Sequence, residues 1–473
     1  DMVMYPEAGP YRVTGDVIVD PGVTLTILPG TTVFFDAGAG LTVNGRLVAE
    51  GTADKPIRLT AYPGSGYWDG IHFQNTLEDN RITHAIVEYG EGYYGPGGDN
   101  AAATNARLLL DHDFFDHARY RRIRTVNSSL TVTNSTFTDI FGPSEAPLTN
   151  NRSEQIWGSN APNGGWILIQ GNVFGTTKGH NDIIDLNGGH RAAGAPVPRI
   201  LDNLFLGGGD DALDLEGDFV IEGNTFLHFH KDPLYHTTEP GESNVISAGD
   251  AANVGYEYVV ARNVFYDIDH AVLIKDGSTL HFLNNTVVDV ASGKAAIYFD
   301  VVGDSAGAGR AAYIDGSIFD NVAVVIDPSV RSGARAPTVT VNRSVIAPQW
   351  HSYGTGNTAE SPRLVDPLIG LFELGPGSPA LGTGPNGLDM GAKTPGGASI
   401  SGDPESITRF DSATLTIDGP GITHYKYFVN TIGDWNAATE YSVATPLLLA
   451  GLNDGTYTVY VKGKNMSGAW QAE

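Results

Sequence analysis

The segments Asn203-Leu204-Phe205 and Asn224-Thr225-Phe226 are two copies of one phrase, an asparagine followed two residues later by a phenylalanine. In most copies a short alternating strand precedes the asparagine, and a turn rich in glycine or aspartate follows. Repeated units of this size stack on their neighbours, so the phrase predicts a solenoid of short strands. The other copies are Asn134-Ser135-Thr136-Phe137, Asn172-Val173-Phe174, Asn263-Val264-Phe265 and the weaker Asn285-Thr286-Val287.

The spacing between copies indicates the size of one unit. Asn203 and Asn224 lie 21 residues apart, and Asn263 and Asn285 lie 22 apart, which fits one coil of a three-strand β-helix. The longer intervals fit one coil plus an insertion. Asparagines stacked at one turn can hydrogen-bond along the axis as a ladder, so we interpret these residues as structural.

The first 90 residues extend the same pattern. Short apolar strands such as 17–19, 25–27 and 32–35 alternate with turns that contain Pro21-Gly22 and Pro29-Gly30. Each strand is too short to be stable alone, but strands stacked in parallel bury a continuous ladder of apolar side chains. The sequence has no amphipathic helical stretch of convincing length, which predicts an all-β protein.

Composition limits the partners and the compartment. The 473 residues carry a net charge of −26, which disfavours nucleic acid and anionic membranes as partners. The chain has no cysteine and no transmembrane run, and its start at Asp1-Met2-Val3 resembles a processed end. Few charged residues and 60 glycines are typical of bacterial secreted and cell-surface proteins, so we expect an extracellular or cell-surface location.

The strand pattern resembles the right-handed parallel β-helix proteins, the superfamily of pectate lyases and polygalacturonases. The resemblance covers roughly residues 10–392. It also rests on the closing phrase Pro376-Gly377-Ser378-Pro379-Ala380 with Leu388-Asp389-Met390-Gly391-Ala392, which looks like the exit of bacterial β-helix repeat proteins. We therefore predict a right-handed parallel β-helix over residues 1–392.

A second module is expected after a linker at residues 393–402. Alternating strands at 413–417, 425–429 and 457–461 make residues 403–473 resemble a small immunoglobulin- or fibronectin-type β-sandwich. Its final strand is missing from the sequence, so we expect a partial sandwich in a longer multidomain chain. The protein is expected to be a monomer.

Three segments on neighbouring predicted coils carry the unusual polar residues, at 180–186, 210–216 and 269–276. We align them on the inward-facing Leu186, Leu215 and Ile274. Period-two alternation then places Asp185, Asp214 and Glu216 on the outer face. Lys275 falls beside Glu216, one or two coils along.

A second column is expected at the start of the same strands. There Asp182 and Asp211 align, with His270 next. Neighbouring strands lie about 4.8 Å apart. Carboxylates this close cannot all ionise freely, so at least one pKa should rise, as a general acid requires.

The acidic segments resemble the motifs of polygalacturonases, in which acids on successive coils carry out inverting hydrolysis. The resemblance implies that Asp182, Asp210 and Asp211 are the catalytic acids. The spacing differs from the family pattern, because Asn181 abuts Asp182 and Ala271 follows His270. The predicted function is a polysaccharide hydrolase. Its acid and base candidates are Asp182, Asp211 and Asp214. Asp185 and Asp210 assist them, and His270 and Lys275 position the substrate.

Two alternatives use the same residues. In a Ca²⁺-dependent polysaccharide lyase, Lys275 or Lys231 would abstract a proton, and Asp185, Asp214 and Glu216 would hold Ca²⁺ through hard oxygen ligands. In a non-enzymatic surface or adhesive scaffold, the acids would be structural or solvated. No cofactor other than Ca²⁺ is indicated.

Side chains that could contact a sugar flank the central coils. Aromatic faces can stack on pyranose rings through apolar C–H contacts, and a guanidinium can bind hydroxyl or carboxylate groups. The candidate substrate-binding residues are Trp157, Trp166, Tyr235 and Arg191.

Overall fold

The computed structural model describes residues 1–91, 99–140, 153–179, 181–232, 243–249, 255–299, 308–330, 335–393, 398–402, 404, 408, 410–419, 422–465 and 470–471. The chain divides into two compact units. The first comprises Asp1–His281, Val287–Tyr313 and Asn321–Val339, and the second comprises Phe282–Thr286, Ile314–Asp320 and Thr340–Glu473. Among the described residues, no helix combines the length and apolar character needed to span a membrane.

Three long parallel sheets form a β-helix, because each coil contributes one strand to each sheet. The first sheet contains β1 (Met2–Met4), β4 (Thr24–Ile27), β7 (Arg46–Glu50), β10 (Asn80–Thr83), β13 (Arg107–Asp111), β16 (Ser129–Thr133), β19 (Ile167–Gln170), β22 (Arg199–Leu201), β25 (Phe219–Glu222), β28 (Glu257–Ala261), β31 (Thr279–Leu283), β34 (Ala311–Asp315) and β37 (Thr338–Asn342).

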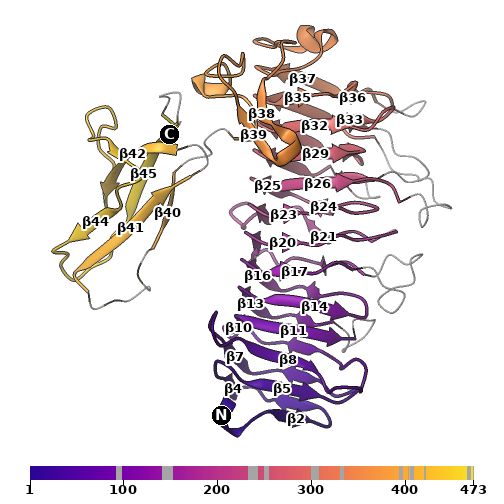
Figure 1. Ribbon diagram of the computed structural model, residues 1–473, viewed down its shortest axis with the longest axis vertical. Coiled ribbons are helices and arrows are strands. Elements are labelled where there is room, and N and C mark those ends of the chain that lie inside the picture. Colours follow the sequence, from indigo (N-terminus) through magenta and orange to yellow (C-terminus); the bar gives the residue numbers. More distant parts are fainter. Residues whose placement is uncertain are drawn as a thin grey trace. The chain divides into compact units, whose positions relative to one another are not determined.

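The second sheet contains β2 (Tyr11–Val13), β5 (Thr32–Phe35), β8 (Ile57–Ala61), β11 (Ala85–Gly90), β14 (Phe114–Ala118), β17 (Thr136–Phe137), β20 (Val173–Phe174), β23 (Leu204–Phe205), β26 (Thr225–Phe229), β29 (Val264–Ile268), β32 (Thr286–Val290) and β35 (Ile318–Asp320). In Figure 1 its strands follow one another from the indigo N-terminus through magenta.

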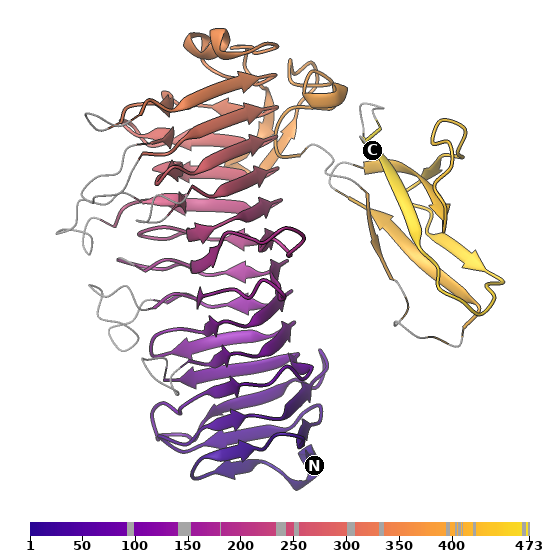
Figure 2. The same ribbon diagram turned by 180° about the vertical axis from the view of Figure 1, so that it is seen from behind.

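The third sheet, which carries the candidate site, contains β3 (Val17–Val19), β6 (Leu41–Val43), β9 (Ile71–Gln74), β12 (Ala101–Thr104), β15 (Ile123–Val126), β18 (Ile156–Ser159), β21 (Ile184–Gly189), β24 (Leu213–Gly217), β27 (Asn244–Ala248), β30 (His270–Ile274), β33 (Ala295–Tyr298) and β36 (Val324–Asp327). The same succession of coils is visible from behind in Figure 2. The predicted all-β parallel β-helix is confirmed.

The repeated asparagines form the expected ladder at the start of the second-sheet strands. Asn203 Oδ1 accepts hydrogen bonds from both the backbone N and Nδ2 of Asn172, at 2.9 Å each. Asn224 Oδ1 accepts the same two hydrogen bonds from Asn203, and Asn263 Oδ1 accepts them from Asn224. All four residues are buried, so the ladder satisfies backbone groups that water cannot reach.

The first copy of the phrase is offset by one residue. Thr136 pairs with Val173 and Phe137 pairs with Phe174, so Ser135, and not Asn134, occupies the ladder position. The Oδ1 of Asn172 accepts from Ser135 N at 2.9 Å. Asn134 instead adopts a left-handed conformation, with φ of 50°. An asparagine tolerates that conformation better than most residues do, which explains its place at the corner.

The phenylalanines of the phrase form a continuous stack in the interior. The ring centres of successive residues are 4.7 to 5.2 Å apart. Parallel pairing fixes this geometry, since equivalent residues of adjacent coils lie one strand spacing apart. The stack contains Phe115, Phe137, Phe174, Phe205, Phe226 and Phe265.

In the second unit, the closing phrase packs against late β-helix residues. Ala380 and Met390 share a buried apolar cluster with Ile318 and Val345. This region contains β38 (Leu364–Asp366) and β39 (Leu371–Leu374), which pair antiparallel. The described 3₁₀ helices of the chain are η1 (Pro6–Ala8), η2 (Pro348–Tyr353), η3 (Pro367–Ile369) and η4 (Pro385–Gly387).

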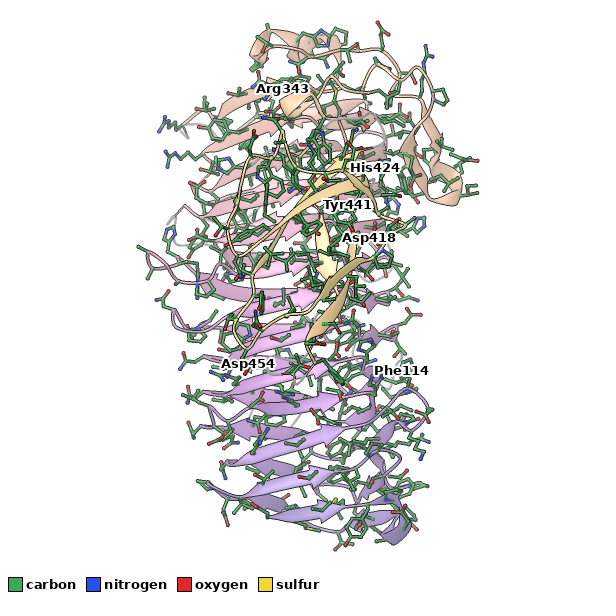
Figure 3. The ribbon with its side chains drawn as sticks, turned by 90° about the vertical axis from the view of Figure 1, so that its left-hand side faces the viewer. Phe114, Arg343, Asp418, His424, Tyr441 and Asp454 are labelled. Carbon is green, nitrogen blue, oxygen red and sulfur yellow. The ribbon has the colours of Figure 1, made fainter. Side chains whose placement is uncertain are left out.

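The last strands of the second unit form two three-stranded antiparallel sheets. Leu415, Ile417, Tyr425 and Leu447 form their buried core, and Figure 3 labels Tyr441, which pairs with Tyr425. Part of the predicted linker is in fact a strand, since Ser399–Ser401 pairs with Thr416–Asp418. The strands are β40 (Ser399–Ser401), β41 (Ser412–Asp418), β42 (Ile422–Val429), β43 (Tyr441–Ser442), β44 (Leu447–Ala450) and β45 (Val459–Asn465).

Candidate active site

The strand register of the third sheet brings an aromatic residue and two acids into one outward-facing column. Trp157 of β18 lies opposite Asp185 of β21, which lies opposite Asp214 of β24. Ser247 of β27 continues the column. The flanking residues Ile184 and Leu186 are buried, so alternation directs Asp185 outward. The predicted pairing of Asp185 with Asp214 is therefore present.

A second group of acids lies where the strands begin. Carboxylate oxygens of Asp182, Asp210 and Asp211 all lie within 4.8 Å of one another. The backbone N of Asp211 donates to Asp182 Oδ1 at 3.2 Å. Asn244 donates to Asp211 Oδ1 from its backbone N at 2.8 Å and from Nδ2 at 3.0 Å. These bonds hold Asp211 in one orientation beside Asp182.

Burial and mutual repulsion raise the pKa values of these acids. Burial and then the Asp214 charge raise the pKa of Asp185 to about 8. The same two causes raise the pKa of Asp211 to about 7, against the bonds from Asn244. The pKa of Asp182 lies well above its usual value because the residue is buried and surrounded by acids, with Asp210 the strongest neighbour. Burial and mutual repulsion therefore favour the protonated forms of these carboxyl groups.

Lys275 supplies the balancing positive charge, since its Nζ lies 3.6 Å from Asp214 Oδ1. Burial lowers the pKa of Lys275, but the charges of Asp214 and Asp211 outweigh it and raise the pKa above its usual value. The lysine follows β30, two coils from β24, and the intervening coil places Gly249 beside it. A Cβ on Gly249 would lie 2.9 Å from Lys275 Cγ. Glycine thus leaves room for the lysine to cross the coil.

His270 lies one coil beyond Asn244, which separates it from Asp211. Asn244 pairs with His270 and lies between it and Asp211 in the column. The Nδ1–H of His270 donates to the Ala295 carbonyl at 2.6 Å, and its ring lies 4.4 Å from that of Tyr298. Tyr298 OH in turn donates to Asn244 Oδ1 at 2.7 Å. A chain of contacts through Tyr298 and Asn244 therefore links His270 to Asp211.

Two residues of the site were not predicted from the sequence. Arg121 Nε donates to Glu154 Oε2 at 2.5 Å, and its guanidinium lies 4.5 Å from the ring centre of Trp157. The Glu154 charge raises the pKa of Asp185, and the Arg121 charge lowers it. Their positions could have been found by aligning Ile123 with Ile156, which pair across the intervening insertion.

Several predicted site residues are engaged elsewhere. Trp166 precedes β19 of the first sheet, where its Nε1 donates to Thr131 Oγ1 at 2.9 Å. The Arg191 guanidinium donates to the carbonyls of Pro196, Ala161 and Pro162, at 2.8 to 3.0 Å, so it anchors a loop. Tyr235 lies outside the described residues.

The three acids predicted to hold Ca²⁺ do not form one group. Glu216 Oε2 accepts a hydrogen bond from Asn187 Nδ2 at 2.5 Å, and Asp214 forms an ion pair with Lys275. The set with oxygens at metal-ligand spacing is instead Asp182, Asp210 and Asp211. Carboxylate oxygens of this kind fit a hard cation such as Ca²⁺, but the prediction of a bound ion stays a prediction.

Comparison with known proteins finds similarity over parts of the chain. Residues 1–107 match the family model described as a pectate-lyase like beta helix domain. A curated relative, "Protein bark beetle" of Drosophila melanogaster, is 40% identical over 62 residues, which are 13% of this chain and 2% of that protein.

Solved structures with low identity also align with the chain. The catalytic domain of a GH87 alpha-1,3-glucanase in complex with tetrasaccharides aligns with a TM-score of 0.38 and 14% identity, over 71% of this chain and 64% of that one. An alginate lyase from Paenibacillus sp. str. FPU-7 gives a TM-score of 0.31 and 12% identity, over 64% and 93%. A rhamnogalacturonan lyase gives 0.31 and 14%, over 74% and 84%.

Proposed function

We propose that this protein is a carbohydrate-active enzyme that hydrolyses a polysaccharide on the outer face of its third sheet. The observation that carries the proposal is the pairing of Asp185 and Asp214 in different electrostatic surroundings. Glycoside hydrolysis needs one carboxylic acid to protonate the leaving oxygen and one carboxylate to act as base or nucleophile. Two acids that lie side by side in different surroundings can divide these two roles.

The two roles follow from the contacts of each acid. Asp185, whose pKa is raised to about 8, keeps its proton at neutral pH and can donate it to the glycosidic oxygen. Asp214, the second acid of the pair, lies 3.6 Å from the Lys275 Nζ. Asp214 can therefore activate a water or attack the anomeric carbon as the glycosidic bond breaks. Trp157, one strand spacing from Asp185, offers a face for an adjoining sugar ring.

The lysine contacts favour hydrolysis over a lyase that uses Lys275 as base. Proton abstraction requires a neutral amine. The surrounding acids instead raise the pKa of Lys275, which keeps it protonated. In the proposed hydrolase Lys275 orients and balances Asp214, and His270 positions Asp211 through Asn244.

Replacement of Asp185 by Asn and of Asp214 by Asn in separate variants tests the proposal. Each variant should lose at least about 100-fold in turnover, because acid–base groups contribute about 10² to 10⁴ in rate. The measurement is release of reducing ends from a panel of polysaccharides, with unfolding curves to verify the fold. Asp327→Asn is the matched control, since Asp327 faces outward on the same sheet opposite Tyr298.

The competing proposal is a non-enzymatic surface scaffold whose acids are structural. Undiminished turnover in Asp185→Asn and Asp214→Asn would contradict the proposed site, and absence of turnover on every polysaccharide would favour the scaffold. We also propose an extracellular bacterial location and a monomeric state. The proposed location rests on the composition of the sequence.

A further inference from the structure

A second concave site lies on the outer face of the second sheet, on coils closer to the N-terminus than the acids. β5, β8 and β11, which border it, are successive strands in the indigo and purple part of Figure 1. A cavity of about 510 Å³ opens there. We call it the tyrosine pocket, and its lining includes Phe34, Arg58, Tyr62, Tyr67 and Tyr89.

Hydrogen bonds fix the loop that forms one wall of the tyrosine pocket. Tyr62 N donates to the Phe35 carbonyl at 2.6 Å, and Ser65 Oγ donates to the Tyr62 carbonyl at 2.7 Å. At the far end of the loop, Trp68 is buried, stacks on Phe35 at 4.0 Å and donates from its backbone N to the Tyr89 carbonyl. The aromatic walls are therefore preformed, which reduces the entropy cost of binding a ligand.

The charges around the tyrosine pocket are already paired with one another. Arg58 Nε donates to Glu88 Oε1 at 2.8 Å. Arg12 Nε donates to Asp36 Oδ1 at 2.9 Å, and its guanidinium lies 3.8 Å from the ring centre of Tyr62. A charged ligand would have to compete with these pairs. A neutral ligand with an apolar face and a polar rim can instead stack on the rings while Arg58, which lines the pocket, bonds its edge.

We propose that the tyrosine pocket is a non-catalytic binding site for the pyranose rings of a neutral polysaccharide. A second hollow of about 330 Å³, bordered by Pro6, Pro10 and Thr32, shares Phe34 with the tyrosine pocket. Two hollows that share one aromatic side chain suit consecutive sugars of a chain better than a single monosaccharide. The pocket shares no lining residue with the acids of the third sheet, so binding there does not depend on the proposed hydrolysis.

Affinity electrophoresis of the full chain in gels that contain a neutral glucan tests this site. The probes are soluble starch, β-1,3-glucan and hydroxyethylcellulose, with polygalacturonate as the anionic comparison. We expect retardation by at least one neutral glucan and none by polygalacturonate. Tyr62→Ala should weaken that binding about tenfold, which corresponds to about 1.4 kcal/mol for a lost aromatic stack. Tyr62→Phe, which keeps the ring, should bind as the parent protein does.

Two further variants test whether the tyrosine pocket itself carries the binding. Tyr67 also lines this pocket, so loss of binding in Tyr67→Leu supports the proposal even if Tyr62→Ala fails to fold. Tyr313→Ala removes an exposed aromatic ring from β34 of the first sheet and should leave the retardation of the gel band unchanged. Failure of every neutral glucan to retard the parent protein would overturn the inference, as would full binding by folded Tyr62→Ala. Neither result depends on turnover.

Discussion

Asp113 occupies the ladder position that asparagine takes in later coils, and it lacks the amide that completes the ladder there. Its Oδ1 accepts from Ala85 N at 2.8 Å, as an asparagine oxygen would. Its Oδ2 is buried with no hydrogen-bond partner among the described residues. In the asparagine coils the equivalent Nδ2 donates to a backbone carbonyl, as Asn172 does to Val132 O at 2.9 Å.

Replacement of Asp113 by Asn should therefore stabilise the protein by about 1–3 kcal/mol at pH 7. Burial raises the pKa of Asp113 well above its usual value, so the folded state keeps a proton that the unfolded state releases above about pH 4. This difference in bound protons lowers the free energy of unfolding as pH rises. The amide of Asp113→Asn does not titrate, so the variant lacks this loss of stability. Denaturation curves at pH 4 and pH 7 measure the effect, and an equal gain at both values would contradict this explanation.

Gly249 is a single residue on which the position of Lys275 depends, because it has φ of 131° and adjoins Lys275. Gly249→Ala should lower turnover at least about tenfold by displacing the lysine from Asp214, and should cost about 1–3 kcal/mol of stability. Gly189→Ala is the matched control. It also has positive φ, but a Cβ there would meet nothing within 4 Å. Equal loss of turnover in the two variants would show that Lys275 placement is not the cause.

At the scale of the element, the ladder and the phenylalanine stack hold each coil on the next. Asn224 is fully buried, and its Oδ1 accepts from Asn203 N and Nδ2 while its Nδ2 donates to the Ile200 carbonyl at 2.9 Å. Removal of the side chain removes these bonds from the interior, although Asn203 Nδ2 keeps its bond to the Ile169 carbonyl at 3.0 Å. The cost of such a change depends on how many buried groups lose their bonds.

Asn224→Ala should therefore cost about 3–5 kcal/mol, which chemical denaturation can measure. Asn224→Ser should cost less, because a hydroxyl at this position accepts a backbone N–H elsewhere in the ladder, as Ser135 does from Asp113 N at 3.0 Å. A loss of less than about 1 kcal/mol in Asn224→Ala would mean that the ladder does not contribute to stability as proposed.

The repeat made the coils predictable, but not every position within them. Alignment on inward apolar residues correctly paired Asp185 with Asp214, because period-two alternation fixes the face of each residue. The same alignment did not predict the one-residue offset at Asn134. It also placed His270 directly after Asp211, whereas Asn244 lies between them. Arg121 and Glu154 were missed because an insertion separates their coils in sequence. Loop contacts, such as those of Arg191, have no periodic signal at all.

At the scale of the whole molecule, the buried acids make stability depend on pH in an unusual direction. Asp185, Asp211 and Asp182 all have raised pKa values, and burial raises that of Asp99 to about 6. These four acids therefore hold more protons in the folded protein than in the unfolded chain between about pH 4 and pH 8. Stability falls with rising pH wherever the folded state holds more protons. The net charge of −26 adds repulsion in the same direction.

The free energy of unfolding should accordingly decrease as pH rises from about 5 to 8, and denaturation curves at unit intervals measure this slope. The Asp182→Asn, Asp185→Asn and Asp211→Asn triple variant should flatten it, because amides hold no titratable proton. Asp327→Asn, with an outward acid of the same sheet, should leave it unchanged. A parent slope of the opposite sign would mean that these acids ionise freely in the folded protein. It would remove the protonated Asp185 on which the proposed acid catalysis rests.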